Sequence, residues 1–129
     1  MDILETITAN TRREVAWQKQ TLPVDALLRL GSPWLAEAPR SMRRALAESE
    51  TGIIAEFKRR SPSKGWINRE ADVRTVASDY QANGAAALSI LTDTPYFGGS
   101  AEDLIAARPQ IDIPILRKDF TIDEFQLYE

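Results

Sequence analysis

Two short apolar segments of the sequence end in charged side chains that could carry acid–base chemistry. The first, IIAEFK, places Glu56 and Lys58 on either side of Phe57. In a β-strand the two charged side chains would share one face and Phe57 would take the other, because strand side chains alternate. Burying an acid and a base at the end of a strand costs free energy, unless the two are paired with each other or the cost is accepted for a function.

The second segment, PILRKDF, carries Arg117, Lys118 and Asp119 at the end of another predicted strand. A lysine amine placed at such a strand end can act as a general acid. Base rates favour solvated charges here, and a surface salt bridge between Glu56 and Lys58 would contribute only about 0–1 kcal/mol. Spacing alone leaves both the catalytic and the surface interpretation open.

The composition restricts the chemistry that these residues can do. The chain has 129 residues, a formal net charge of -3, and neither cysteine nor histidine. Disulfides, thiolate chemistry and Ser-His or Cys-His catalysis are therefore excluded, and a zinc site is improbable. Acid–base work falls to Lys, Glu, Asp or Tyr. The length and the 43% hydrophobic content suit one globular domain.

Partners and compartment follow from what the sequence lacks. No apolar run approaches the roughly 20 residues of a membrane span, and the N-terminus lacks the layout of a signal peptide. The mildly acidic charge does not favour nucleic acid as a partner. We expect a cytoplasmic protein that binds neither membrane nor nucleic acid.

The first fifty residues predict helices. Asp2 can cap a helix over residues 2–20, and a second helix begins after Pro23 and is expected to stop at Gly31-Ser32-Pro33. Ser41 can cap a third helix that ends before Gly52. We expect residues 1–50 to form a helical extension.

Residues 51–129 predict alternating strands and helices. Apolar runs favour strands at 53–57, 85–91 and 113–116. Asp72 can cap a helix that stops at Asn83-Gly84. Strands that begin roughly thirty residues apart, with helices between them, are typical of parallel βα units.

Two more helix starts are predicted from capping boxes. Ser100 and Asp103 fit one at the beginning of a helix that ends at Pro109, and Thr121 and Glu124 fit another.

Three stretches together carry a family resemblance. IIAEFKRRSPSKGW, LSILTDTPYFGGSAEDL and PILRKDF resemble, in order and spacing, the first three strand–loop segments of the indole-3-glycerol phosphate synthase family. The resemblance implies an α/β fold of the TIM (β/α)8 barrel family, here the N-terminal helical extension plus about three βα units. It also implies a carbon–carbon lyase (a carboxy-lyase) of tryptophan biosynthesis.

The resemblance also implies roles for the charged residues. Lys118 matches the general acid of the family, which protonates a carbonyl oxygen during ring closure. Lys58 resembles the residue that contacts the substrate carboxylate and serves in dehydration. Glu56 resembles the glutamate that hydrogen-bonds the substrate and holds the lysines. Asp119 is expected to hold its loop or to orient Lys118.

Substrate-binding residues are carried over in the same way. Ser61 resembles the loop serine at the phosphate end of the substrate, while Phe97 and Phe120 resemble aromatics of the apolar pocket. For Phe97, packing under the barrel rim is an equal alternative. Asp93 could be catalytic, but its sequence context favours a turn residue that hydrogen-bonds its own backbone.

The reaction implied is closure of an indole ring without cofactor or metal. The substrate is a small phosphate, 1-(2-carboxyphenylamino)-1-deoxyribulose 5-phosphate. The products are indole-3-glycerol phosphate, carbon dioxide and water.

A complete barrel of this type needs about 250 residues. We therefore expect an N-terminal piece that lacks normal activity alone and needs a second chain, or a copy of itself, to cover its sheet. Two alternatives remain: another phosphate-handling barrel enzyme such as phosphoribosylanthranilate isomerase, and a non-catalytic half-barrel module that oligomerises.

Overall fold

The computed structural model describes residues 1–129 and folds them into two compact units. The terminal unit combines residues 1–38 with residues 120–129, and the sheet unit comprises residues 39–119. The helices of the terminal unit are α1 (Ile3–Thr21), α2 (Val24–Leu35) and α6 (Phe125–Tyr128). The elements of the sheet unit are α3 (Met42–Glu48), β1 (Ile54–Phe57), β2 (Arg60–Ser61), β3 (Gly65–Trp66), α4 (Val73–Ala82), β4 (Ala87–Leu91), α5 (Ala101–Ala107), a 3-10 helix (Arg108–Gln110) and β5 (Ile115–Lys118).

The three longer strands of the sheet unit form one parallel sheet in the order β1-β4-β5. Each strand follows its predecessor in the sheet after a helical crossover, which is the arrangement that the thirty-residue spacing predicts. The strand β4 lies in the centre and is buried along its whole length. Its two neighbours each keep one edge without a strand partner.

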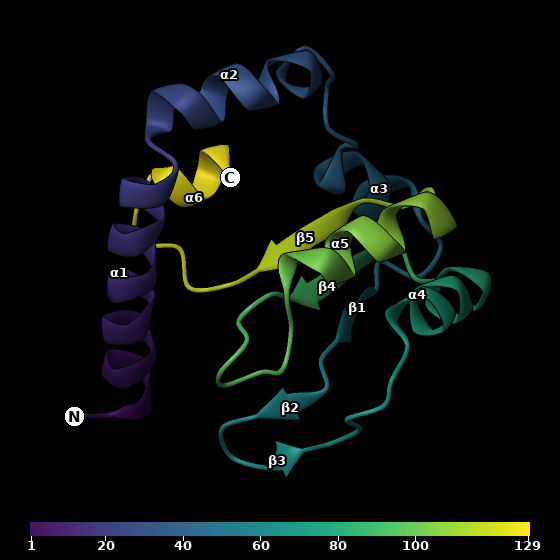
Figure 1. Ribbon diagram of the computed structural model, residues 1–129. Helices are drawn as coiled ribbons and strands as arrows, with labels where there is room; N and C mark the ends of the chain where they lie inside the picture. Colours follow the sequence, from purple (N-terminus) through teal and green to yellow (C-terminus); the bar gives the residue numbers. More distant parts are fainter. The chain divides into compact units, whose positions relative to one another are not determined.

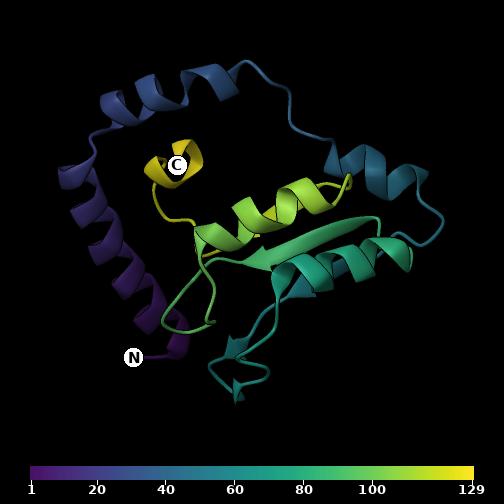
Figure 2. The same cartoon turned by 45° about the vertical axis from the view of Figure 1, so that its right-hand side comes forward.

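Helices α4 and α5 cover one face of this sheet (Figures 1 and 2). Alternation sends Phe57, Leu88 and Ile90 toward that face, where they are almost completely buried. They form the core of the unit with further buried residues of the two helices and the following turn, namely Val73, Ala77, Ala107 and Ile111. Burial of the phenylalanine, leucine, isoleucine and valine side chains contributes about 1.5–3 kcal/mol each, so this face holds the unit together.

Local signals explain where α4 begins and ends. The side chain of Asp72 accepts a hydrogen bond from the backbone N–H of Arg74 at 3.1 Å and so caps the first turn. Asn83 ends the helix, and Gly84 follows with a φ of 98°, a left-handed conformation that glycine adopts without strain. Both boundaries agree with the prediction.

A small hairpin, rather than an irregular loop, follows β1. Strands β2 and β3 pair antiparallel, and the carbonyl of Arg59 accepts hydrogen bonds from the N–H groups of Ile67 and Asn68. Gly65 supports the tight turn with a φ of 64°. Figure 1 shows the hairpin beyond the carboxyl end of β1.

The terminal unit is built on α1. Asp2 and Glu5 form a reciprocal capping box, with bonds of 2.7 and 3.0 Å, at its first turn. Its buried residues, Ile7, Thr11 and Val15, recur every fourth position and so form one face. The prediction of this helix is confirmed. No helix in the structure is both long enough and apolar enough to cross a membrane.

The second helix does not stop at Gly31-Ser32-Pro33 as predicted, because α2 continues to Leu35. Pro33 has no N–H to donate to the carbonyl of Arg29 one turn earlier. The hydroxyl of Ser32 donates to that carbonyl instead, at 3.0 Å. This replacement hydrogen bond allows a proline inside the helix.

The two predicted capping boxes are wrong. Ser100 does precede α5, but no side-chain hydrogen bond caps the helix, because the Asp103 carboxylate is bound by Arg59. The last helix begins at Phe125 rather than after Thr121, since the side chain of Gln126 accepts the N–H groups of Ile122 and Asp123.

The third strand is displaced toward the C-terminus relative to its prediction. It covers Ile115–Lys118 instead of residues 113–116, because Leu88 pairs with Ile115 and Leu91 with Lys118. Lys118 is therefore the last residue of a strand rather than part of the following loop.

Candidate active site

The strand register brings the carboxylate of Glu56 and the predicted general acid, Lys118, to one face of the sheet. Glu56 pairs with Ser89, and Leu91 pairs with Lys118. Ser89 and Leu91 are two positions apart on the central strand and therefore point the same way. Glu56, Ser89 and Lys118 thus lie on the face opposite to the one that α4 and α5 cover.

Lys58 joins this group at the level of Lys118. Phe57 pairs with Ile90, so the following residue, Lys58, lies beside Leu91. Neighbouring strands are about 4.8 Å apart, which places the backbones of Lys58 and Lys118 roughly 10 Å from each other. Both lysine side chains are exposed, and both are long enough to reach a molecule bound over Leu91.

Glu56 holds two of its neighbours. Its Oε1 lies 3.5 Å from Nζ of Lys58, and its Oε2 accepts a hydrogen bond of 2.9 Å from the hydroxyl of Ser89. Ser89 is buried, whereas the side chains of Glu56 and Lys58 remain 36% and 37% exposed. A pair this exposed contributes at most about 1 kcal/mol, so its place in the sheet is not explained by stability.

The first loop places Ser61 on β2. Ser61 is buried, and its hydroxyl accepts a hydrogen bond from the N–H of Lys64 at 3.2 Å. The serine predicted at the phosphate end of the substrate is therefore part of an ordered hairpin.

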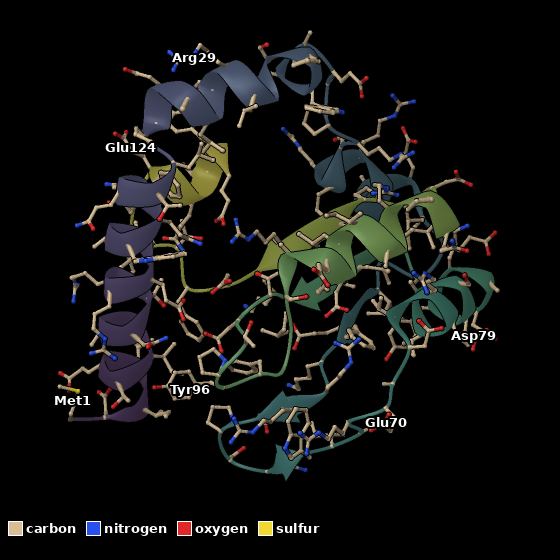
Figure 3. All side chains as sticks on the ribbon, viewed as in Figure 1. Met1, Arg29, Glu70, Asp79, Tyr96 and Glu124 are labelled. Carbon is tan, nitrogen blue, oxygen red and sulfur yellow. The ribbon has the colours of Figure 1, made fainter.

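The second loop, between β4 and α5, places Phe97, which is partly exposed. The carboxylate of Asp93 accepts a hydrogen bond of 2.9 Å from the N–H of Tyr96, so the interpretation of Asp93 as a turn residue is confirmed. The carbonyl of Gly99 accepts a hydrogen bond of 2.7 Å from the hydroxyl of Thr94. In Figure 3, Tyr96 marks this loop.

Arg59 connects the two loops. Its guanidinium donates to both carboxylate oxygens of Asp103 at 2.7 and 2.9 Å, and to the carbonyls of Ala71 and Gly98 at 2.9 and 3.3 Å. It also lies 4.9 Å from the centre of the Phe57 ring. The hydrogen bonds to Asp103 raise the pKa of Arg59. The residue after Lys58 is thus anchored to the start of α5.

Phe120, the remaining predicted site residue, belongs to the terminal unit, where its carbonyl accepts a hydrogen bond from the side chain of Gln126 at 3.1 Å. The structure therefore brings Glu56, Lys58 and Lys118 to one face of the sheet unit. The roles of these three residues and of Ser61, Phe97 and Phe120 stay predictions. No group of three or more acidic side chains gathers into a metal site.

Three residues that hold this site together carry no prediction from the sequence: Ser89, Arg59 and Thr92, whose hydroxyl donates to the carboxylate of Asp119 at 2.6 Å. Ser89 could have been found from its position in the second apolar run, where a polar residue on a buried strand needs a partner. Thr92 and Arg59 gave no local signal, because their partners lie far away in the sequence.

Comparison with known proteins gives this geometry a context. A family model described as indole-3-glycerol phosphate synthase matches residues 4–129. The chain belongs to this family. It is 56% identical over 130 residues to the indole-3-glycerol phosphate synthase of Bacteroides thetaiotaomicron, a match that covers 99% of this chain and 48% of that protein. Identity to the proteins of the same name is 42% in Laribacter hongkongensis and 44% in Rhodospirillum rubrum, each with 99% of this chain and 49% of the relative covered.

Membership of the indole-3-glycerol phosphate synthase family agrees with the fold. The helices and the parallel sheet form part of a (β/α)8 barrel. The carboxyl ends of its strands carry Glu56 and Lys118, and this is the end where barrel enzymes place their active sites. The chain spans about half the length of the curated relatives that it matches.

Proposed function

We propose that this chain carries the first half of an indole-3-glycerol phosphate synthase active site. The observation that supports this function best is the common face of Glu56, Lys58 and Lys118 at the carboxyl ends of β1 and β5, the two strands on either side of β4 in the parallel sheet. A substrate bound there would meet the ammonium groups of two lysines whose backbones are roughly 10 Å apart, with a carboxylate beside one of them.

The substrate in this proposal is 1-(2-carboxyphenylamino)-1-deoxyribulose 5-phosphate. The ring carbon that bears the carboxylate attacks the ribulose carbonyl carbon, and Lys118 donates a proton to the carbonyl oxygen as charge develops on it. Loss of carbon dioxide leaves the electron pair in the ring and restores aromaticity. The hydroxyl then leaves as water while the new five-membered ring loses a proton, and this dehydration completes the indole.

The other residues bind and orient in this proposal. Lys58 contacts the substrate carboxylate and serves in dehydration. Glu56 is already hydrogen-bonded by Ser89 and paired with Lys58, so its carboxylate is oriented before the substrate arrives. Ser61 contacts the phosphate, while Phe97 and Phe120 contribute apolar surface around the anthranilate ring.

A second polypeptide segment is also proposed, because the site face of the sheet is incomplete. Ile54 and Leu116 lie on this face and remain 44% and 45% exposed. Both β1 and β5 keep an unpaired edge, and parallel sheets are stable when both faces are covered. We propose that the covering segment corresponds to the second half of the relatives.

The test combines this chain with the second half of the Bacteroides thetaiotaomicron relative as a separate polypeptide. Light scattering reports whether the two associate, and indole fluorescence reports turnover. We expect association, turnover by the pair only, and a loss of at least about 100-fold in kcat with Lys118→Ala.

The matched control is Arg43→Ala, which removes an exposed cation of α3 and should leave turnover unchanged. Turnover by the purified 129-residue chain alone would overturn the need for a second segment. Association without turnover would overturn the catalytic proposal and favour a non-catalytic module, for which the exposed apolar face is the supporting observation.

A further inference from the structure

Thr92, the residue that follows β4, bonds to the end of β5 through both its backbone and its side chain. Its N–H donates to the carbonyl of Lys118 at 3.0 Å, and its hydroxyl donates to the carboxylate of Asp119 at 2.6 Å. Thr92 is 7% exposed and the side chain of Asp119 is 12% exposed. These bonds are therefore shielded from water. Hydrogen bonds are stronger in such surroundings than in water.

Arg117 completes the arrangement from the other side of Lys118. Its Nε donates to the hydroxyl oxygen of Thr92 at 3.3 Å, and its Nη2 lies 3.9 Å from the Asp119 carboxylate. The residues immediately before and after Lys118 are thus both tied to Thr92. Alternation places Arg117 and Asp119 on the face opposite to that of Lys118.

The chemistry of the threonine hydroxyl suits this position. A carboxylate only accepts hydrogen bonds and a guanidinium only donates them, so the atom between them must do both. A hydroxyl donates its proton to Asp119 and accepts from Arg117 at the same time. Valine has the same shape as threonine but can do neither.

We propose that Thr92 is a positioning residue for Lys118. Its hydroxyl binds the two residues that flank Lys118, Arg117 and Asp119, and we call this pair of hydrogen bonds the bracket. The bracket holds the ammonium of Lys118 toward the face of Glu56 and Lys58. The inference rests on the proposed function of Lys118 as the general acid. It adds a residue that never touches the substrate. Displacements of about 1 Å at a reacting group can cost on the order of 100-fold in rate, so the loss of the bracket should be measurable in turnover.

The kinetic experiment compares Thr92→Val with Thr92→Ser in the complex of this chain with the second half of the Bacteroides thetaiotaomicron relative. We expect Thr92→Val to lower kcat about 10- to 100-fold with little change in KM, because binding does not depend on the bracket. Thr92→Ser keeps the hydroxyl and should stay within about threefold of the wild type. A Thr92→Val complex within twofold of the wild type would overturn the proposal.

A second measurement on the 129-residue chain does not depend on turnover. The amide of Thr92 donates to Lys118 at one end of the β4–β5 pair, and the amide of Leu88 donates to the carbonyl of Pro114 at the other end, at 2.9 Å. In Thr92→Val we expect hydrogen exchange of the first amide to accelerate about tenfold or more, while that of Leu88 is unchanged.

The two readouts separate the possible failures. If the wild-type complex does not turn over substrate, the proposed function fails, while the exchange of the amide at position 92 still decides whether the hydroxyl holds the backbone at Lys118. If the complex is active and both amides exchange in Thr92→Val as in the wild type, the bracket is wrong. If both amides accelerate equally, the threonine stabilises the whole sheet and the positioning role is also wrong.

Discussion

Arg59 shows at the level of a single residue how the loops of the site are held. Its side chain is 18% exposed and that of Asp103 is 10% exposed, so the bidentate pair is largely desolvated. Such a pair adds little relative to apolar packing, but removing one partner leaves the other charge buried and unpaired. The two backbone carbonyls that Arg59 also binds would lose their donors as well.

We therefore predict that Arg59→Ala lowers the free energy of unfolding by about 3–5 kcal/mol, measured by urea denaturation. Arg59→Lys keeps the charge but not the planar fork, and should recover only part of that loss. The matched control is Arg44→Ala, which removes a pair with Glu48 whose side chains are 76% and 67% exposed. Its effect should be about 0.3–0.5 kcal/mol, and equal effects at the two arginines would contradict the prediction.

At the level of the elements, close backbone approach shapes the loop that carries Phe97. Gly99 lies against the carbonyl of Leu91, the residue between the two site lysines, and a Cβ at this glycine would overlap that carbonyl oxygen. The N–H of Gly99 donates to the carbonyl of Asp93 at 2.9 Å, so the loop folds back on the end of β4. No side chain fits at this position without moving the loop.

We predict that Gly99→Ala lowers the free energy of unfolding by about 1–3 kcal/mol, because the loop must shift to admit the methyl group. Gly31→Ala is the matched control: it lies inside α2 with no neighbour within 4 Å of the added Cβ. That change should stabilise the chain by about 0.4–1 kcal/mol. Thermal and urea unfolding of the two variants test the opposite signs, and destabilisation by Gly31→Ala comparable to that by Gly99→Ala would refute the steric explanation.

At the level of the whole molecule, the first and last segments of the chain form one unit through a charge pair. Nζ of Lys19 lies 2.7 Å from the carboxylate of Asp123, and the side chains of Gln18 and Glu129 meet at 3.2 Å. The hydrogen bond from Lys19, followed by that from the N–H of Phe125, lowers the pKa of Asp123.

This shift predicts a dependence on pH. Because the folded state lowers the pKa of Asp123, the pair stabilises the fold fully above the unfolded pKa of about 3.9, and its contribution is lost as the pH falls through the folded pKa. The difference in unfolding free energy between the wild type and Asp123→Asn should be constant from pH 5 to 7 and should shrink below about pH 4. A difference that grows toward acid pH would contradict this sign. Because the side chains of Lys19 and Asp123 are 40% and 29% exposed, salt should reduce the difference as well.

Local signals in the sequence determined much of this fold. Asp2 and Glu5, Ser41, and Asp72 with Gly84 each act within a few residues, so the start of three helices and the end of α4 could be predicted from neighbouring positions. The same is true of Glu56 and Lys58, whose shared face follows from strand alternation alone.

Only the tertiary structure decided the features that depend on distant partners. Asp103 looks like a helix cap in the sequence, but Arg59, 44 positions away, binds its carboxylate. Thr92 gives no signal of its own, because its hydroxyl finds Asp119 only once β4 and β5 are in register. The register is set by burial of alternate side chains along the whole sheet, so one sequence segment does not contain it. The side chains able to do the chemistry can be read along the chain, whereas the contacts that orient them exist only in the folded sheet.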